Sequence, residues 1–213
     1  MVRKIAEKGY IFLMLGILYA PILMIIIYSF SNTNNFTFPE GFTFEAYVQL
    51  FTNAPRKLWD SMLNTIIIAV VSSVLATLIG SISAVGIYYL KPRARRIVEN
   101  VNQLPIINSE IVMAVSLMLF FATFGFPQGY VRLIIGHVSF CTPYVILSVM
   151  PRLMQMDPNI YEAALDLGAS PIKALFKVII PTILPGVISG FAMAFTISLD
   201  DFIITQLTKG SST

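Results

Sequence analysis

The chain has 213 residues, of which 56% are hydrophobic and only 12% are charged. Together with a mean hydropathy of +0.79, this composition excludes a water-soluble domain and predicts an all-α bundle that crosses a bilayer several times. The net charge of +3 is small, so the positions of the basic residues are more informative than their number. The single cysteine, Cys141, excludes a disulfide within the chain.

Five apolar segments are long enough to be transmembrane helices. They are residues 10–30, 61–90, 104–124, 130–150 and 181–207. The first segment is interpreted as a retained helix and not as a cleaved signal peptide, because it can span a membrane and no small-residue cleavage site follows it.

The basic residues predict the orientation of the chain. Arg3, Lys4 and Lys8 precede the first span and therefore place the N-terminus in the cytoplasm. The segments 91–96 and 157–177 then lie on the cytoplasmic side as well. The first of these, KPRARR, could be read as a nucleic-acid patch, but its position at the end of a span favours a topology anchor. We expect contact with membrane lipid and no nucleic acid.

The segment 31–60 separates two expected domains. It is polar and rich in turn residues, and it ends with an amphipathic piece at residues 44–51. We therefore expect residues 1–60 to form an N-terminal transmembrane helix with an extracellular loop. Residues 61–213 form the second domain.

Small residues recur at every fourth position in two of the spans. Such a pattern allows helix backbones to approach closely in a membrane, where packing holds helices together. Both helices are therefore expected in the interior of the bundle. The residues are Ser72, Ala76, Gly80 and Ala84 in the second span, and Gly186, Gly190, Ala194 and Ser198 in the fifth.

His137 and Cys141 lie four residues apart in the fourth span. Two such residues could contribute to a metal site, but no third ligand is close in the sequence. We therefore expect no bound metal and predict that His137 makes a hydrogen bond to another helix.

The segment 157–185 has the pattern of two helices joined by a sharp turn. Asp157 can accept from free N–H groups at the start of the first helix, and Gly168 can adopt the left-handed conformation that ends it. Ser170 and Pro171 then form a second start signal. Each helix carries charged residues four apart, so an amphipathic segment on the bilayer surface is one interpretation.

The order of residues in this segment favours another interpretation. Glu162-Ala163-Ala164, Gly168 and Ile180-Pro181 closely resemble the EAA motif of ABC-importer membrane subunits, the MetI-like permeases. The resemblance implies a type I ABC importer permease fold in a bacterial inner membrane. It also implies that the segment docks into a separate ATPase through Glu162, Ala163, Ala164, Gly168 and Pro181.

Two adjacent carboxylates, Asp200 and Asp201, lie inside the fifth apolar segment. A carboxylate in hydrocarbon is costly and usually faces protein or water. At about 100° per residue, Asp201 points in the mean direction of the small residues on its helix, with Asp200 about 100° away. The two residues could be hydrated and inert at a helix end, or they could bind a cationic substrate. Glu110 in the third span is a further candidate.

Further segments resemble the polyamine permeases of the same family. They are residues 195–201 with the following KGSS, residues 110–114, residues 137–143, and, more weakly, the GFT of the first loop. The resemblance implies transport of spermidine or putrescine past Asp201, Asp200 and Glu110. It implies as partners two copies of an ATPase, a second permease subunit and an extracellular polyamine-binding protein. Members usually have a sixth span after the point where this sequence ends, so the second domain is expected to be C-terminally incomplete.

The sequence contains no glycine-rich phosphate loop of the Gly-x-x-x-x-Gly-Lys-Ser/Thr type. We therefore expect no enzymatic activity and no cofactor, with ATP bound by the partner. A permease for iron(III) or a sulfate-type anion and a secondary transporter without an ATPase are the alternatives. An intramembrane aspartyl protease is disfavoured, because neighbouring aspartates on one helix point about 100° apart and cannot share a proton.

Overall fold

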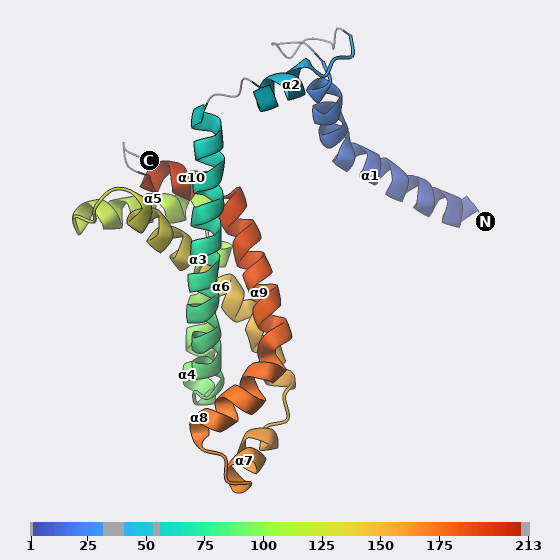
Figure 1. Ribbon diagram of the computed structural model, residues 1–213. Coiled ribbons are helices and arrows are strands. Elements are labelled where there is room, and N and C mark those ends of the chain that lie inside the picture. Colours follow the sequence, from blue (N-terminus) through green and yellow to red (C-terminus); the bar gives the residue numbers. More distant parts are fainter. Residues whose placement is uncertain (1, 32–40, 53–55, 210–213) are drawn as a thin grey trace. The chain divides into compact units, whose positions relative to one another are not determined.

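The computed structural model describes residues 2–31, 41–52 and 56–209, and within these ranges it contains helices and no strand (Figure 1). The chain divides into two compact units, Met1–Ser61 and Met62–Thr213. Most of the expected polar loop, from Asn32 to Pro39, lies outside the described residues. So do the side chains of Arg3 and Lys4, on which the predicted orientation partly depends.

The first unit consists of a long apolar helix and a short amphipathic one. Helix α1 (Val2–Ser29) is long and apolar enough from Lys8 onwards to cross a membrane. Helix α2 (Glu45–Thr52) confirms the predicted amphipathic piece. The ring of Phe30, the residue after α1, stacks on that of Phe42 at 5.3 Å and lies 5.4 Å from that of Tyr47 on α2. The Thr43 N–H also donates to the Phe30 carbonyl at 2.8 Å.

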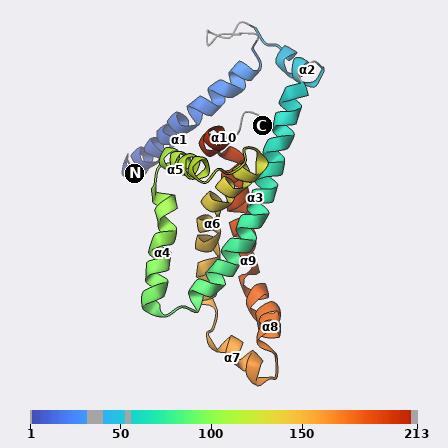
Figure 2. The ribbon, with the colours of Figure 1, turned by 90° about the vertical axis from the view of Figure 1, so that its left-hand side faces the viewer.

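Three long helices form the body of the second unit. They are α3 (Arg56–Tyr88), which begins in the first unit, α6 (Tyr130–Gln155) and α9 (Ile180–Asp200). All three run alongside one another in both views (Figures 1 and 2). Their buried residues form one core, which includes Cys141, Val145 and Val149 on α6.

The small residues on α3 and α9 are all buried, as predicted. They allow both helices to press against the same side chain of α6. A Cβ atom added at Gly80 would lie 2.7 Å from the Cβ of Val145, and one added at Gly190 would lie 3.1 Å from its Cγ1. Both helices are therefore interior, and Val145 marks their crossing point.

The third predicted span, residues 104–124, is not one helix. Helix α4 (Pro92–Ile107) and helix α5 (Glu110–Thr123) meet at an angle of 103°. Asn108 and Ser109 between them have extended backbones. Ser109 at the N-cap and Glu110 in the first turn match a helix-start signal in the sequence, although the Ser109 side chain makes no capping hydrogen bond. Figure 2 shows α5 lying across the upper end of α4.

The fifth predicted span, residues 181–207, is wrong at both ends. A continuous apolar helix runs from Pro171 to Asp200 through α8 (Pro171–Ala174), the π-helical segment η1 (Leu175–Ile179) and α9. Pro181 lacks the N–H that would bond in an α-helix, and the wider π turn before it accommodates the ring. At the other end Asp201 is extended, and the short helix α10 (Ile203–Thr208) follows.

The number of predicted spans agrees with the structure. Among the described residues, four helices are long and apolar enough to cross a membrane, and the bent pair α4–α5 can form a fifth span.

Candidate functional site

Three carboxylates border one pocket in the second unit. Glu110 begins α5, and Asp200 and Asp201 lie at the end of α9. The pocket has a volume of about 190 Å³. The break after α9 and the bend before α5 thus bring together three acidic residues that are far apart in the sequence. The other lining residues are Phe140, Thr196 and Ile197.

Asp201 lies in the corner between α9 and α10, with only 2% of its side chain exposed. Its Oδ1 accepts from the Ile204 N–H at 3.3 Å, and its Oδ2 accepts from the Thr205 N–H at 3.1 Å. These donors are free because they begin α10. The predicted inward direction of Asp201 is confirmed, although the residue is no longer helical.

Asp200 has a different environment from its neighbour. It is exposed and lines the pocket, while Glu110 is half-buried on the facing element. Of the three carboxylates, those of Asp200 and Glu110 are therefore more accessible to a soluble ion than that of Asp201.

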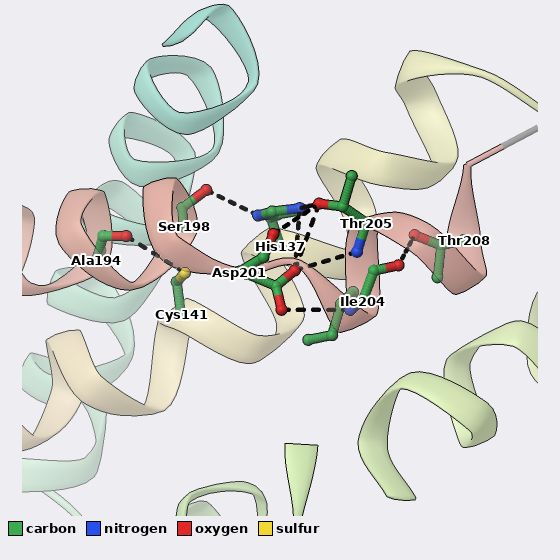
Figure 3. Close-up of polar contacts among 8 residues, drawn as sticks. All are labelled: His137, Cys141, Ala194, Ser198, Asp201, Ile204, Thr205 and Thr208. Atoms are coloured by element: carbon green, nitrogen blue, oxygen red, sulfur yellow. Dashed lines mark hydrogen bonds and ion pairs between the residues drawn. The ribbon is translucent and has the colours of Figure 1, made fainter. Parts of the chain in front are cut away.

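His137 joins α6 to both sides of the corner (Figure 3). Its ring is 2% exposed. Nδ1 lies 2.8 Å from the Ser198 Oγ on α9, and Nε2 lies 3.0 Å from the Thr205 Oγ1 on α10. Nε2 is also 3.5 Å from Oδ2 of Asp201. The predicted hydrogen bond from His137 to another helix is confirmed.

Cys141, one turn further along α6, takes no part in this network. Its thiol donates to the Ala194 carbonyl at 3.5 Å. In the part of the chain that the structure describes, no group of three histidine, cysteine, aspartate or glutamate residues could hold a metal ion.

The sequence analysis did not single out four residues of this site: Phe140, Thr196, Ile197 and Thr205. Thr205 had a local signal, since it follows Asp201 by four residues and so belongs to the turn that an aspartate can cap. Phe140 had none, because an aromatic residue in a membrane helix is not distinctive. Its place at the pocket depends on the packing of α6 against the end of α9.

The predicted helix–turn–helix of residues 157–185 is also present. Oδ1 of Asp157 accepts from the Asn159 N–H at 2.9 Å and so begins α7 (Asn159–Asp166). Gly168 has a φ of 86°, and the Ala169 N–H bonds back to the Ala164 carbonyl at 3.0 Å. This is the left-handed glycine ending that the sequence predicted.

The second helix of the turn has the predicted cap. The Ser170 Oγ accepts from the Lys173 N–H at 3.4 Å. Pro171 occupies the first helical position, where its missing N–H costs nothing.

The turn presents an uncovered surface. Glu162, Ala163 and Gly168 are exposed, Ala164 is half-buried, and the Leu167 residue at the tip is 89% exposed. Ile172 on α8 and Phe176 on η1 are also exposed, by 69% and 62%, so this part of the chain offers apolar surface to a protein partner or to lipid. Pro181 is separate from this surface, because it lies within the long helix beyond η1.

A second pocket of about 610 Å³ lies where α7 approaches the ends of α3 and α4. Arg95 pairs with Glu99 at 2.8 Å and lies over the ring of Tyr88 at 5.6 Å. The rings of Tyr89 and Tyr161 are 5.9 Å apart. Burial, together with the two neighbouring tyrosines, raises the pKa of the Tyr89 hydroxyl above its ordinary value. The contact between Tyr89 and Tyr161 thus links α7 to the end of α3.

Relatives of known function match most of the chain. The permease protein PotC of the spermidine/putrescine transport system of Haemophilus influenzae is 34% identical over 212 residues, which are 100% of this chain and 82% of the relative. PotC of Escherichia coli K12 is also 34% identical and is covered to 80%. The permease protein PotI of the putrescine transport system of E. coli K12 is 33% identical, with 94% of this chain and 74% of the relative covered.

Comparison with solved structures supports the fold. The crystal structure of a bacterial ABC transporter involved in the import of the acidic polysaccharide alginate matches 99% of this chain and 75% of its own chain. The TM-score is 0.76 at 18% sequence identity, so this likeness concerns the fold alone. Residues 76–212 match the family described as binding-protein-dependent transport system inner membrane component. The chain is therefore a multi-pass membrane protein that belongs to this family of transport permeases.

Proposed function

We propose that the chain is a permease subunit of an ATP-driven importer of polyamines. The observation that carries the proposal is the pocket between α5, α6 and α9, in which three carboxylates meet inside an apolar bundle. Such residues are expensive in a membrane and are typical of a path for ions. The names of the PotC and PotI relatives support the same substrate class.

The chemistry of the pocket suits an ammonium group. Asp200 and Glu110 supply negative charge, and Phe140 adds an aromatic ring of the kind that attracts cations. A volume of about 190 Å³ corresponds to roughly six water molecules. The pocket therefore accommodates one end of a polyamine at a time, and the rest of the molecule extends along the path.

The turn between α7 and α8 is the proposed contact with the ATPase. Its exposed Leu167 and the adjacent Glu162 and Ala163 give a compact surface, and Gly168 fixes the angle between the two helices. The contact of Tyr161 on α7 with Tyr89 at the end of α3 supports a role in transmitting movement. ATP is bound and hydrolysed by the partner and not by this chain.

The proposed assembly contains two ATPase subunits, a second permease subunit and an extracellular polyamine-binding protein. It lies in a bacterial inner membrane, with the α7–α8 turn and the N-terminus in the cytoplasm. The proposed transport domain comprises residues 61–213, and residues 1–60 form an additional transmembrane helix and extracellular loop.

Reconstitution tests the proposal. The chain is combined in liposomes with its candidate ATPase, second permease and binding protein, and uptake is measured with spermidine, putrescine, iron(III) and sulfate. We expect ATP-dependent uptake of a polyamine and ATP hydrolysis that the loaded binding protein stimulates. ATP-dependent uptake of iron(III) or sulfate in its place would contradict the substrate. Uptake without the ATPase would instead identify a secondary transporter.

A further inference from the structure

His137 is the only side chain of α6 that bonds to both helices of the α9–α10 corner among the described residues. It reaches Ser198 in the last turns of α9 and Thr205 in the first turn of α10. Figure 3 shows the ring lying between these two hydroxyls, with the Asp201 carboxylate beside it. One imidazole therefore connects the helix that precedes the corner with the helix that follows it.

The partners of the ring favour one of its two neutral tautomers. An ionised carboxylate oxygen can only accept, so the Asp201 Oδ2 at 3.5 Å favours a proton on Nε2. Nε2–H then donates to the Thr205 Oγ1, and the Thr205 hydroxyl donates to the Asp201 main-chain carbonyl at 3.1 Å. Nδ1 is left to accept from the Ser198 hydroxyl. Each buried polar group of the network has a partner in this arrangement.

The same network occupies the oxygens of Asp201. Both accept from the N–H groups that begin α10, and one faces the imidazole. Helix α10 has six residues, which is too short to be stable without such support. Asp201 is therefore committed to holding the corner, whereas Asp200 is exposed to the pocket.

We propose that His137 is a positioning residue of the substrate pathway: by joining Ser198 to Thr205 it holds the α9–α10 corner, so that Asp201 faces inwards and Asp200 faces the pocket. This inference rests on the proposed function for its transport consequence, but its geometric part can be tested alone.

The geometric part is tested on the full chain in lipid nanodiscs. His137 is the chain's single histidine, so isotope-labelled histidine gives one imidazole in a nitrogen NMR spectrum. We expect a proton on Nε2 and none on Nδ1. Asp201→Asn should shift the Nε2 signal, and Asp200→Asn should leave it unchanged. A proton on Nδ1, or a signal that responds only to Asp200→Asn, would overturn the proposed network.

The transport part uses the reconstituted importer. His137→Phe replaces the imidazole with a somewhat larger aromatic ring that makes no hydrogen bonds, and we expect it to raise the KM for spermidine by about tenfold. His137→Gln, whose amide can still donate near the position of Nε2, should recover part of the loss. Cys141→Ser is the control, because this buried residue lies on the same helix outside the network.

The outcomes separate the two proposals. If His137→Phe assembles normally and transports spermidine with an unchanged KM, His137 has no positioning role. If the unmodified importer transports no polyamine, the proposed function fails, while the NMR result still decides whether the corner is held as described.

Discussion

Asp200 and Asp201 are adjacent in the sequence, yet the structure gives them different environments. Asp201 has 2% of its side chain exposed and accepts from two main-chain N–H groups. Asp200 is exposed at the pocket. Helical periodicity predicted the inward direction of Asp201. It could not predict that Asp201 caps α10, because the calculation treats the segment as one continuous helix and the structure ends α9 at Asp200.

This difference predicts distinct mutant phenotypes. Asp201→Ala removes a helix cap, so we expect a loss of about 0.5–2 kcal/mol in stability and a lower thermal midpoint, with weaker uptake as a consequence. Asp200→Asn should leave the thermal midpoint unchanged and raise the KM for spermidine. Thermal unfolding of the purified complex and initial uptake rates measure the two effects. Equal thermal midpoints for the unmodified protein and both variants would contradict the capping role of Asp201.

The crossing of α3 and α6 at Gly80 allows a paired test of packing. A Cβ at Gly80 would lie 2.7 Å from the Cβ of Val145, whereas nothing lies within 4 Å of a Cβ at Gly86 on the same helix. We expect Gly80→Ala to destabilise the protein by about 1–3 kcal/mol through overpacking. Gly86→Ala should be neutral or stabilising by up to about 1 kcal/mol. Thermal unfolding in detergent compares the two variants, and equal midpoints would argue against a close approach of α3 and α6 at Gly80.

At the scale of elements, the turn between α7 and α8 is the part of the site that the sequence predicted best. Its signals are local: Asp157 and Ser170 cap helices through their own side chains, and Gly168 has the positive φ that ends α7. None of these interactions depends on another part of the chain. For this reason one short stretch of sequence was sufficient to predict them.

Substitutions at Gly168 should act through the backbone conformation and not through side-chain volume, since the φ is positive and a Cβ there would meet nothing within 4 Å. Gly168→Asp should leave the protein inserted in the membrane but uncouple ATP hydrolysis from polyamine uptake. Gly168→Asn is the matched control, because asparagine tolerates the left-handed region better than most residues, and it should retain more coupling. The ratio of polyamine transported to ATP hydrolysed is the measurement. An unchanged ratio in Gly168→Asp would argue against the docking role.

The breaks after Ile107 and Asp200 were not predicted, although each lies in an apolar run. Hydropathy over a span-length window cannot detect two extended residues, and the Ser109–Glu110 start signal is short. The corner after Asp200 is bonded on both sides to His137, which is far away in the sequence. Tertiary contacts of this kind determine where a membrane helix ends, so they had to come from the structure.

The π-helical segment η1 connects the turn to α9 and gives a further prediction. The Ile180 N–H bonds to the Leu175 carbonyl, five residues earlier, and Pro181 supplies no donor for the next turn. Pro181→Ala restores that donor, so hydrogen exchange of the amides in residues 175–181 should slow. Pro185→Ala, one turn further along the same helix, is the control and should leave those amides unaffected. Unchanged exchange in Pro181→Ala would mean that the proline does not cause the π segment.

At the scale of the whole molecule, the first unit by itself leaves the apolar helix α1 uncovered. Every residue of α1 from Lys8 to Ile27 is exposed. Lipid and a second permease subunit are the expected neighbours of this surface. The sequence predicted membrane insertion and the family from composition and one motif. It could not separate spermidine from putrescine, since a binding protein outside this chain would make that choice.

The proposed orientation can be tested with single cysteines. In a Cys141→Ser background, Leu167→Cys on the α7–α8 turn and Phe51→Cys on α2 introduce thiols at positions that are 89% and 73% exposed. A membrane-impermeant maleimide added to intact cells with a permeabilised outer membrane should label Phe51→Cys and not Leu167→Cys. In inverted vesicles the labelling should be reversed, and the ATPase subunit should protect Leu167→Cys. Labelling of both positions from the same side would contradict the topology.

The early end of α9 has a further electrostatic consequence. A helix that stops at Asp200 leaves its last carbonyl groups without partners in the helix, and the aligned peptide dipoles give this end a partial negative charge of about half an electron. Thr196, Ile197 and Asp200 of the same end line the pocket. A passing ammonium group therefore meets attraction from the main chain as well as from carboxylates, and that part of the attraction persists at any pH.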